Sequence, residues 1–500
     1  PVTPPVTSVS NWASILHSTA TASAKKVKHS RSKSSSTTTA SAPSSAVKFN
    51  MTNESAQEMG ILILRIMYDP NYSVFGEHND LPIFKIAPRG LTNTGNICYM
   101  NSILQILLYC APFNRLLKLI ETKSIGSLGK TSPTPLLDAS IKFFNEFVEK
   151  PSNGQPSEVD DILKDKAISP ENFYMNLISH EKFQHLKWGQ QEDAEEFLGY
   201  YLDGLHEEFL GEIRRLNTPS VDSLIQSFSS EYDTDTEKVN LFKFNIKNTV
   251  KIIKNDNKNS SDSTKESESN NNNDSNNEWK EVGSNSKKIT EKRTVEIEPS
   301  PINMIFGGQF KSVLTIPKAN NPNQFQKSIT LDPFQNLQLD ISEADSIEDA
   351  FLNLNKLEKI SFKSNNNKEV QIKKQTFIDK LPGVLIIHLK RFSFLKDKDV
   401  GIEKLRKKVD YTHDLRVPEE VLSNKLSVAQ DEITFKLIGV VYHHGSSAEG
   451  GHYTSENPLT QEWIRIDDTT LKVITKDEVL NGGTEENIKN AYILLYERYK

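Results

Sequence analysis

The sequence predicts an α+β fold with a largely antiparallel sheet. Apolar residues recur at helical spacing before residue 255, whereas the chain after residue 297 carries short apolar runs typical of strands. This segregation argues against a fold in which strands and helices alternate along the chain. A chain of 500 residues can form one large domain with tails, or a few packed units.

Three helices are expected before the polar tract that starts at residue 255. Residues 136–148 carry apolar side chains at helical spacing, and Pro151 stops the helix beyond them. Ser169 and Pro170 fit the N-cap and the first position of a second helix. The third helix, over residues 193–209, has one apolar stripe, formed by Ala194, Phe197, Leu198, Tyr201, Leu205 and Phe209.

Four apolar runs are predicted to be strands. They cover residues 384–389, 437–442, 463–466 and 491–496. Short runs of this kind favour strands over helices, so we expect them to build the sheet.

Two polar segments lie outside the predicted core. Residues 1–50 are rich in Ser, Thr, Ala and Lys and lack the apolar side chains that offset ordering entropy, which predicts a disordered arm. Within it, residues 12–16 form an apolar island around Trp12 that is either a docking peptide or an incidental cluster. Residues 255–297 are predicted to be a polar, disordered insertion within one folded region, residues 51–500.

The net charge and the number of cysteines limit the classes of binding partner and the cellular compartment that we expect. The net charge of −6 is spread over both signs, and no apolar run approaches the ~20 residues of a membrane span, so we expect no direct nucleic acid and no membrane insertion. In a helix, Cys98 and Cys110 would lie ~18 Å apart, too far for a disulfide. Free thiols fit a reducing compartment, the cytoplasm or the nucleus. A start at Pro1 rather than Met indicates a longer parent protein.

Cys98 is a candidate nucleophile. It lies in the segment Gly-Leu-Thr-Asn-Thr-Gly-Asn-Ile-Cys-Tyr-Met-Asn-Ser, residues 90–102, which reads as a loop that leads into a helix. At a helix start, free N–H groups and the helix dipole would favour the reactive thiolate. Gly90 and Gly95 would allow tight turns, and Asn93 could offer an amide N–H to an oxyanion. Considered alone, Cys98 is also explained as a small buried residue.

His452 and Asp467 are candidates for the base and for the group that orients it. A thiol nucleophile needs a base within hydrogen-bond reach, and that base needs a third group to fix its tautomer. His452 follows two glycines at the end of a strand-like run, and flexible backbone beside an imidazole is unusual in a packed core. Asp467 ends an alternating strand that could pair with the strand of His452.

These segments resemble the ubiquitin-specific protease family. Residues 90–102 contain every specified position of the family's cysteine box, Gly-Leu-x-Asn-x-Gly-Asn-x-Cys-Tyr-Met-Asn-Ser. Residues 450–468 are similar to its histidine box, residues 190–197 to its Gln-(Glu)-Asp-Ala-x-Glu-Phe motif, and residues 306–334 to its β-hairpin fingers. Several motifs in the family's order, spread over about residues 88–500, make the resemblance specific.

The resemblance implies a papain-like cysteine protease fold with thumb, palm and fingers subdomains. It also implies hydrolysis of the bond after the C-terminal glycine of ubiquitin in ubiquitin–protein conjugates. The family's nucleophile falls on Cys98, its base and acid on His452, its orienting carboxylate on Asp467 and its oxyanion amide on Asn93. For Asp468 two interpretations stay open, support of the oxyanion side or a solvated carboxylate after a strand.

Asp193 and Glu196 are candidate substrate-binding residues. At ~100° per residue they lie off the apolar stripe of their helix and remain neighbours, so both are predicted to face solvent. Considered alone, they are explained as solvated carboxylates that favour the helix dipole. The family resemblance implies instead that they contact the arginine-bearing C-terminal tail of ubiquitin.

The resemblance also predicts cofactors and partners. Many relatives hold zinc in the fingers through two Cys-x-x-Cys pairs, but two cysteines cannot supply four thiolates, so we expect no zinc and no other cofactor. The expected partners are ubiquitin and ubiquitinated proteins. Residues 306–314 and 374–382 look most similar to a fungal member that works with an RNA-binding cofactor protein, which implies a protein cofactor bound upstream of the catalytic region.

Two other functions remain alternatives. A different papain-like enzyme, such as a general thiol protease or a transglutaminase, would lack the cysteine box and the motif at residues 190–197. A catalytically silent ubiquitin-binding scaffold would not need all three catalytic residue types, which this chain retains.

Overall fold

The structure is a computed structural model, and it describes most of the chain after residue 55. The described ranges are residues 56–76, 86–125, 132–148, 166–259, 280–282, 290–294, 297–318, 321–363, 369–394, 402–424, 433–447, 450–459, 462–483 and 489–499. The chain divides into two compact units, Pro1–Ala46 and Val47–Lys500, and every described residue lies in the second. The predicted arm, residues 1–50, lies outside the described residues.

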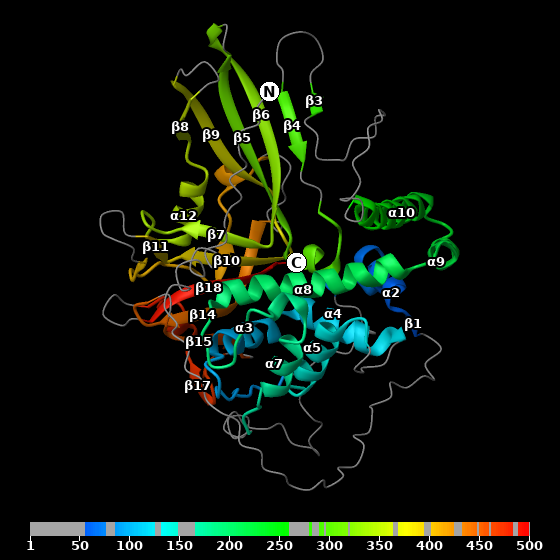
Figure 1. Ribbon diagram of the computed structural model, residues 1–500, viewed down its shortest axis with the longest axis horizontal. Helices are drawn as coiled ribbons and strands as arrows, with labels where there is room; N and C mark the ends of the chain where they lie inside the picture. Colours follow the sequence, from blue (N-terminus) through cyan, green and yellow to red (C-terminus); the bar gives the residue numbers. More distant parts are fainter. Residues whose placement is uncertain are drawn as a thin grey trace, which may run out of the picture. The chain divides into compact units, whose positions relative to one another are not determined.

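Most of the helices precede the long strands in the chain (Figure 1). Their bounds are α2 (Met59–Tyr68), α3 (Cys98–Leu108), α4 (Ala111–Lys123), α5 (Pro135–Asn145), α7 (Glu171–Leu177), α8 (Ala194–Arg215), α9 (Thr218–Glu231), α10 (Thr236–Asn259), α11 (Pro301–Phe306), α12 (Ile347–Leu354) and α13 (Lys476–Val479). Short 3-10 helices cover Pro70–Tyr72, Glu181–Phe183 and Glu419–Val421.

A central sheet carries the last third of the chain. Its strands are ordered β17-β16-β15-β14-β18-β10-β7, and β13 pairs with β14. All neighbours are antiparallel except β10 and β7. The bounds are β7 (Asn336–Asp340), β10 (Val384–Lys390), β13 (Asp414–Arg416), β14 (Thr434–His444), β15 (His452–Pro458), β16 (Trp463–Asp467), β17 (Thr470–Ile474) and β18 (Lys489–Arg498). The predicted α+β fold and all four predicted strands are confirmed.

A second sheet projects as the fingers (Figure 1). Its order is β3-β4-β6-β5-β9-β8, and its long hairpin of β5 and β6 confirms the hairpin expected from the resemblance. The bounds are β3 (Lys280–Val282), β4 (Thr290–Thr294), β5 (Gly308–Lys318), β6 (Asn321–Phe334), β8 (Glu358–Lys363) and β9 (Glu369–Lys380). Two small sheets pair β1 (Gln57–Glu58) with β2 (Ser124–Ile125) and β11 (Phe392–Phe394) with β12 (Ile402–Lys404).

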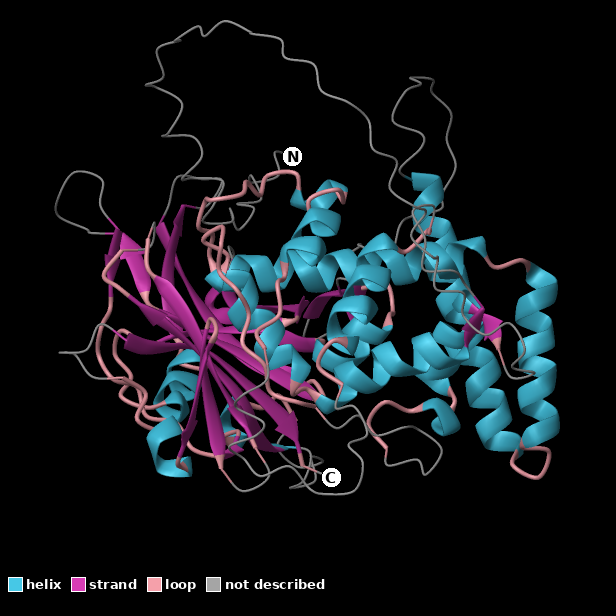
Figure 2. Cartoon of the chain, turned by 90° about the horizontal axis from the view of Figure 1, so that it is seen from below, coloured by secondary structure: helices cyan, strands magenta, loops and turns pink. Residues whose placement is uncertain are grey.

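The middle strands of the central sheet are buried on both faces, which explains the continuous apolar run in β10. Val384 and Ile386 belong to a core shared with α3 and α8, whereas Leu385, Ile387 and Leu389 belong to a second core that includes α12. Successive side chains of a strand point to opposite faces, so a strand covered on both sides has no polar face. Figure 2 shows most of the helices gathered beside the fan of strands.

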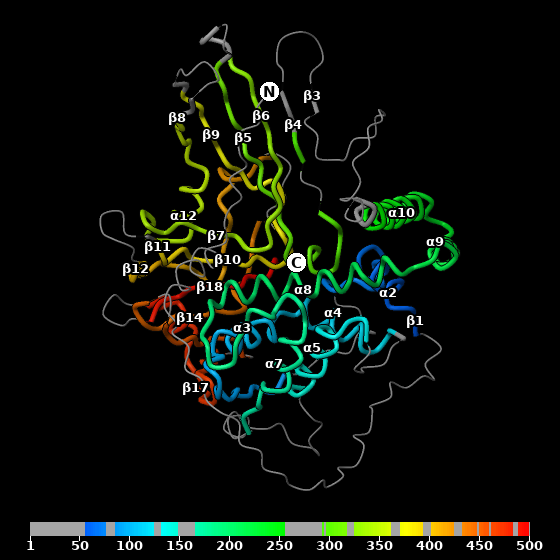
Figure 3. Tube along the Cα trace, viewed as in Figure 1, coloured from blue at the N-terminus to red at the C-terminus, as the bar shows by residue number. Residues whose placement is uncertain are grey.

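Helix α3 joins the two halves of the fold. All of its residues are buried, and it lies against β14 and β15 of the central sheet. In Figure 3 the blue α3 accordingly lies beside strands coloured orange to red, which come from the other end of the described chain. This packing brings residues near position 98 to residues near position 452.

The predicted polar insertion, residues 255–297, is wrong at both ends. Helix α10 continues to Asn259, and β3 and β4 lie inside the predicted range; residues 260–279 are outside the described residues. Phe242, Ile246 and Ile253 bury one face of α10. Once such a face anchors a helix, each further residue adds a hydrogen bond at little cost, so the helix extends into polar sequence.

The second predicted helix begins later than expected. Pro170, rather than Ser169, is the N-cap of α7. The Pro170 carbonyl accepts a hydrogen bond from Tyr174 N at 2.9 Å, the first bond of that helix. Predicted and observed positions differ because the sequence pattern places a proline near a helix start but does not fix which residue accepts the first bond.

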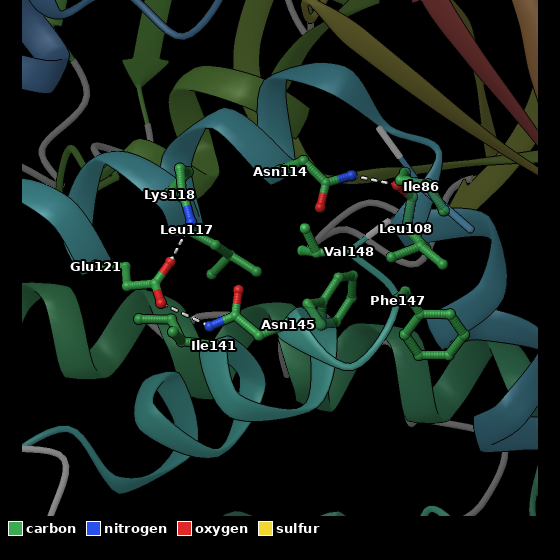
Figure 4. A pocket seen from close by; sticks show the side chains of 11 residues that line it. Ile86, Leu108, Asn114, Leu117, Lys118, Glu121, Ile141, Asn145, Phe147 and Val148 are labelled. Carbon is green, nitrogen blue, oxygen red and sulfur yellow. Dashed lines mark hydrogen bonds and ion pairs between the residues drawn. The ribbon is translucent and has the colours of Figure 1, made fainter. Parts of the chain in front are cut away.

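A small pocket between α4 and α5 belongs to the packing of the helices (Figure 4). Glu121 accepts hydrogen bonds from Lys118 at 2.8 Å and from Asn145 at 2.6 Å. None of the residues that line this pocket is a predicted site residue.

No single helix in the described part of the chain is both long and apolar enough to cross a membrane. Helices α3 and α4 pass that test only as a pair, and the pair is bent by 84°.

Candidate active site

Cys98 is the first residue of α3, as predicted, and it is 2% exposed. The first hydrogen bond of the helix runs from Asn101 N to Ile97 O at 2.9 Å. The N–H groups of the first turn therefore lack intrahelical acceptors, and together with the helix dipole they favour a negative charge at the thiol. The position suits a nucleophile.

The glycines before Cys98 allow other segments to approach closely, and Gly95 lies within a bend of this loop, residues 94–96. Neither Gly90 nor Gly95 has a positive φ; in this loop the left-handed residue is Asn96, with φ 57°. A Cβ at Gly90 would lie 2.6 Å from Thr469 Cα, and one at Gly95 would lie 2.5 Å from the Trp188 ring. Both glycines therefore let other segments approach the cysteine loop.

The strands β15 and β16 bring His452 and Asp467 together. His452 is the first residue of β15, Asp467 is the last of β16, and the two strands are antiparallel neighbours. His452 Nε2 and Asp467 Oδ1 lie 2.6 Å apart. Since Nε2 faces the carboxylate, Nδ1 is left to face the Cys98 thiol.

The surroundings of His452 favour its charged form. The pKa of His452 is raised from 6.5 to about 9, chiefly by its hydrogen bond with Cys98 and less by that with Asp467, against the opposing effect of burial. A cation at His452 pairs with a thiolate at Cys98, and such a pair is the reactive state of a thiol nucleophile.

Asn93 and Asp468 form a second pair beside the thiol. Asn93 Oδ1 accepts a hydrogen bond from Ile97 N at 2.8 Å, and its Nδ2 donates to Asp468 Oδ2 at 3.0 Å. Asp468 adopts a left-handed φ of 50°, and its carbonyl accepts from Leu91 N at 2.9 Å. Of the two interpretations of Asp468, this geometry favours support of Asn93 over a solvated carboxylate.

Asp193 does not face solvent, so this part of the prediction is wrong. It is the N-cap of α8, and its Oδ1 accepts from Glu195 N at 2.7 Å. Its Oδ2 accepts from the Tyr492 hydroxyl of β18 at 2.6 Å. Burial raises the pKa of Asp193. An N-cap of this kind stabilises a helix by about 0.5–2 kcal/mol, so Asp193 fixes the start of α8 against the sheet.

Glu196 is half-buried in the first turn of α8. Burial, and then repulsion by Asp193, raise its pKa to about 7, while a hydrogen bond with Tyr200 acts in the opposite direction. The carboxyl of Glu196 is therefore only partly ionised near neutral pH, and a cationic ligand would favour its charged form.

The residue that the sequence interpretation missed is Gln191. Its Nε2 lies 3.6 Å from Cys98 Sγ and donates to Gly451 O, while its Oε1 accepts from Gly451 N at 3.0 Å. The available signal was its place in the motif at residues 190–197, in which only the acidic positions were singled out.

Two groups of side chains among the described residues lie close enough together to share a metal ion. One is His452 with Asp467 and Asp468, where a metal ion at Nε2 would replace the hydrogen bond between His452 and Asp467. The other is His206 with Glu207 and Glu298, where Arg214 already pairs with both carboxylates. The expectation that the fingers hold no zinc stays a prediction.

A thiol at a helix start, an imidazole that contacts it and a carboxylate behind the imidazole form the constellation of cysteine-type hydrolases. The family model described as ubiquitin carboxyl-terminal hydrolase matches residues 89–496. The chain belongs to this family.

Curated relatives agree with this assignment. Ubiquitin carboxyl-terminal hydrolase 3 of Saccharomyces cerevisiae is 37% identical, over 89% of this chain and 54% of the relative. Probable ubiquitin carboxyl-terminal hydrolase 3 of Schizosaccharomyces pombe is 35% identical, over 83% and 74%. Ubiquitin carboxyl-terminal hydrolase 10 of Gallus gallus is 33% identical, over 83% and 49%. The chain thus spans about half the length of most of these relatives.

Solved structures share the fold. A structure of the yeast SAGA DUBm has a TM-score of 0.52 at 20% identity, covering 84% of this chain and 72% of its own. The SAGA DUB module bound to monoubiquitin has a TM-score of 0.52 at 19% identity, covering 85% and 73%.

Proposed function

We propose that this chain is a deubiquitinating thiol protease that hydrolyses the bond after the C-terminal glycine of ubiquitin in ubiquitin–protein conjugates. The observation that carries the proposal is the contact of Cys98 with His452, itself bonded to Asp467, in a chain of the ubiquitin carboxyl-terminal hydrolase family.

In the first half of the reaction, Cys98 Sγ attacks the carbonyl carbon of ubiquitin's terminal glycine. The carbonyl oxygen becomes an oxyanion, and Asn93 donates its second amide N–H to it, since an amide nitrogen has two hydrogens and Asp468 holds one. His452 then gives its proton to the leaving amine, the C–N bond breaks, and a thioester remains on Cys98.

In the second half, a water molecule replaces the amine. Neutral His452 takes a proton from the water as it attacks the thioester, and the tetrahedral intermediate collapses with loss of the Cys98 thiolate. Asp467 holds the imidazole in one orientation through both halves and stabilises the imidazolium.

Turnover of ubiquitin carrying a fluorophore on its C-terminus, as an amide or an ester, tests this proposal. We expect steady turnover of both substrates, and with the ester an initial burst of one fluorophore per Cys98, because an ester acylates the thiol faster than the thioester is hydrolysed. A general thiol protease would also cleave a short fluorogenic peptide with comparable kcat/KM. Binding of ubiquitin without release of fluorophore would contradict the proposal and indicate the silent scaffold.

Glu196 is proposed to recognise the C-terminal tail of ubiquitin, and Asp193 to act by holding the start of α8. The half-buried carboxylate of Glu196 lies near the N-terminus of this helix, close to the segment of Gln191 that contacts Cys98. An arginine of the tail would supply the cation that favours the charged form of Glu196.

Charge reversal at Glu196 provides the test. In a Cys98→Ala background, Glu196→Arg is expected to weaken ubiquitin binding by roughly tenfold or more through like-charge contact. The matched control is Glu237→Arg, which makes the same change at an exposed position of α10. Equal affinities for the two folded variants, measured by titration with ubiquitin, would remove Glu196 from the recognition surface.

A further inference from the structure

Gln191 bonds to both sides of the catalytic centre. Its Nε2 lies 3.6 Å from Cys98 Sγ, and the same amide makes a reciprocal pair of hydrogen bonds with the backbone of Gly451, the residue before His452. One side chain from the segment before α8 therefore contacts the nucleophile on α3 and the backbone that carries the base on β15.

The backbone around Gln191 is fixed at both ends. On one side, Gly189 N donates to Gly95 O at 3.1 Å, and Asn96 Nδ2 donates to Gly189 O at 2.9 Å, so the segment is bonded to the cysteine loop. On the other side, Asp193 accepts from Tyr492 of the central sheet at 2.6 Å. Gln191 is held between these two anchors, which limits the positions that its side chain can reach.

Gly451 is equally constrained. A Cβ at this position would lie 2.4 Å from His444 O and 2.5 Å from His443 Nε2, so only glycine fits the turn before His452. The Gly451 N–H and C=O both point at the Gln191 amide, which satisfies them together. The backbone that sets the place of the imidazole thus depends on the amide of Gln191.

The thiol has few charged neighbours that could replace this contact. His452 is the cation beside Cys98; the phenols of Tyr99 and Tyr453 also interact electrostatically with Cys98, and Glu192 interacts with the phenol of Tyr99. Burial raises the pKa of both tyrosines, which keeps them neutral. An N–H donor at Gln191 stabilises a thiolate, because a hydrogen bond to the charged form favours that form.

We propose that Gln191 is a positioning residue of the reaction, which donates a hydrogen bond to the Cys98 thiolate and holds Gly451 so that His452 stays within reach of it. This inference rests on the proposed function, since it assigns Gln191 a part in the same thiol chemistry. Gln191 lies outside the constellation of Cys98, His452 and Asp467, and its loss is expected to lower the reactivity of the Cys98 thiolate.

Alkylation of Cys98 by iodoacetamide tests the inference without ubiquitin. The rate is followed from pH 5 to 10 by peptide mass mapping, which separates Cys98 from the fully buried Cys110. Gln191→Glu is the key variant because it keeps the shape and the acceptor for Gly451 N, but replaces the donor with a negative charge. Gln190→Glu is its matched control, since it adds the same charge at the adjacent exposed residue.

For Gln191→Glu we expect the alkylation rate at neutral pH to fall by roughly tenfold, with the midpoint of the rate–pH curve moved to higher pH. Gln190→Glu should follow the unaltered chain. Gln191→Ala, which loses both contacts, should shift the curve less than Gln191→Glu and lower kcat rather than raise KM.

The inference would be overturned if folded Gln191→Glu gave the same alkylation curve as Gln190→Glu. This holds even if the thermal unfolding midpoint of Gln191→Glu falls, because a purely structural role of Gln191 would change stability alone. Failure of the proposed function would look different: the unaltered chain would not turn over the ubiquitin substrate, while its alkylation curve would still respond to Gln191→Glu.

Discussion

Cys98→Ala is expected to abolish hydrolysis of ubiquitin substrates, lowering kcat by roughly 10⁴-fold or more, while ubiquitin binding is preserved. The substitution removes the attacking atom and only a small volume from a residue that is already 2% exposed. The loss should therefore be chemical. Turnover of the fluorogenic ubiquitin substrate and titration with free ubiquitin measure the two parts of this result separately.

Cys110→Ala is the matched control, because it makes the same change at the other cysteine of the chain. Cys110 is fully buried at the N-cap of α4, where burial raises the pKa of its thiol and keeps it inert. We expect chemistry to be retained with a stability loss of about 0.5–3 kcal/mol. Equal loss of turnover in the two folded variants would undo the assignment of Cys98 as the unique nucleophile.

The sequence predicts much of the catalytic centre because its parts follow strong local patterns. The loop-like segment before Cys98 and the apolar run at residues 103–108 predict a helix that begins near Cys98, and α3 begins there. Alternation in residues 463–467 requires a strand that ends at Asp467, and pairing with the next strand in the sheet brings that carboxylate to His452. Each of these inferences needs only the spacing of apolar residues in one element and, for Asp467, the pairing of its strand with the strand beside it.

Asp193 shows where periodicity fails. Helical spacing places a residue on a face, but it does not separate the N-cap, which lies outside the helix, from the first turn inside it. The sequence does contain a signal, since Asp193 followed three residues later by Glu196 fits the pattern of a capped helix start. The bond from Tyr492 joins residues 299 positions apart, and no local pattern predicts a contact of that kind.

Gln191 could not be assigned for a related reason. Its contacts reach Cys98 and Gly451, which are 93 and 260 positions away, and they exist only once α3, β15 and the start of α8 have packed together. A glutamine in a polar segment carries no charge and no periodicity that would mark it as functional. Tertiary packing, rather than sequence pattern, therefore defines this part of the site.

Asp467→Asn is expected to lower kcat by roughly 10²- to 10⁴-fold and to move the alkaline limb of the pH profile to lower pH. In the unaltered chain the pKa of His452 is raised to about 9, so the imidazolium persists up to that pH and kcat/KM should decline above it. The bond from Asp467 is one cause of that rise. Without its charge, His452 loses its proton at lower pH and its orientation is no longer fixed.

Asp468→Asn makes the same substitution one residue on and serves as the comparison. Asp468 Oδ2 lies 3.9 Å from His452 Nε2, against 2.6 Å for Asp467 Oδ1, and its hydrogen bond goes to Asn93 instead. We therefore expect Asp468→Asn to lower kcat with a smaller shift of the alkaline limb, because it weakens support of the oxyanion amide rather than of the imidazolium. Profiles of kcat/KM from pH 6 to 10 for the two variants decide the matter: a larger alkaline shift in Asp468→Asn than in Asp467→Asn would transfer the orienting role to Asp468.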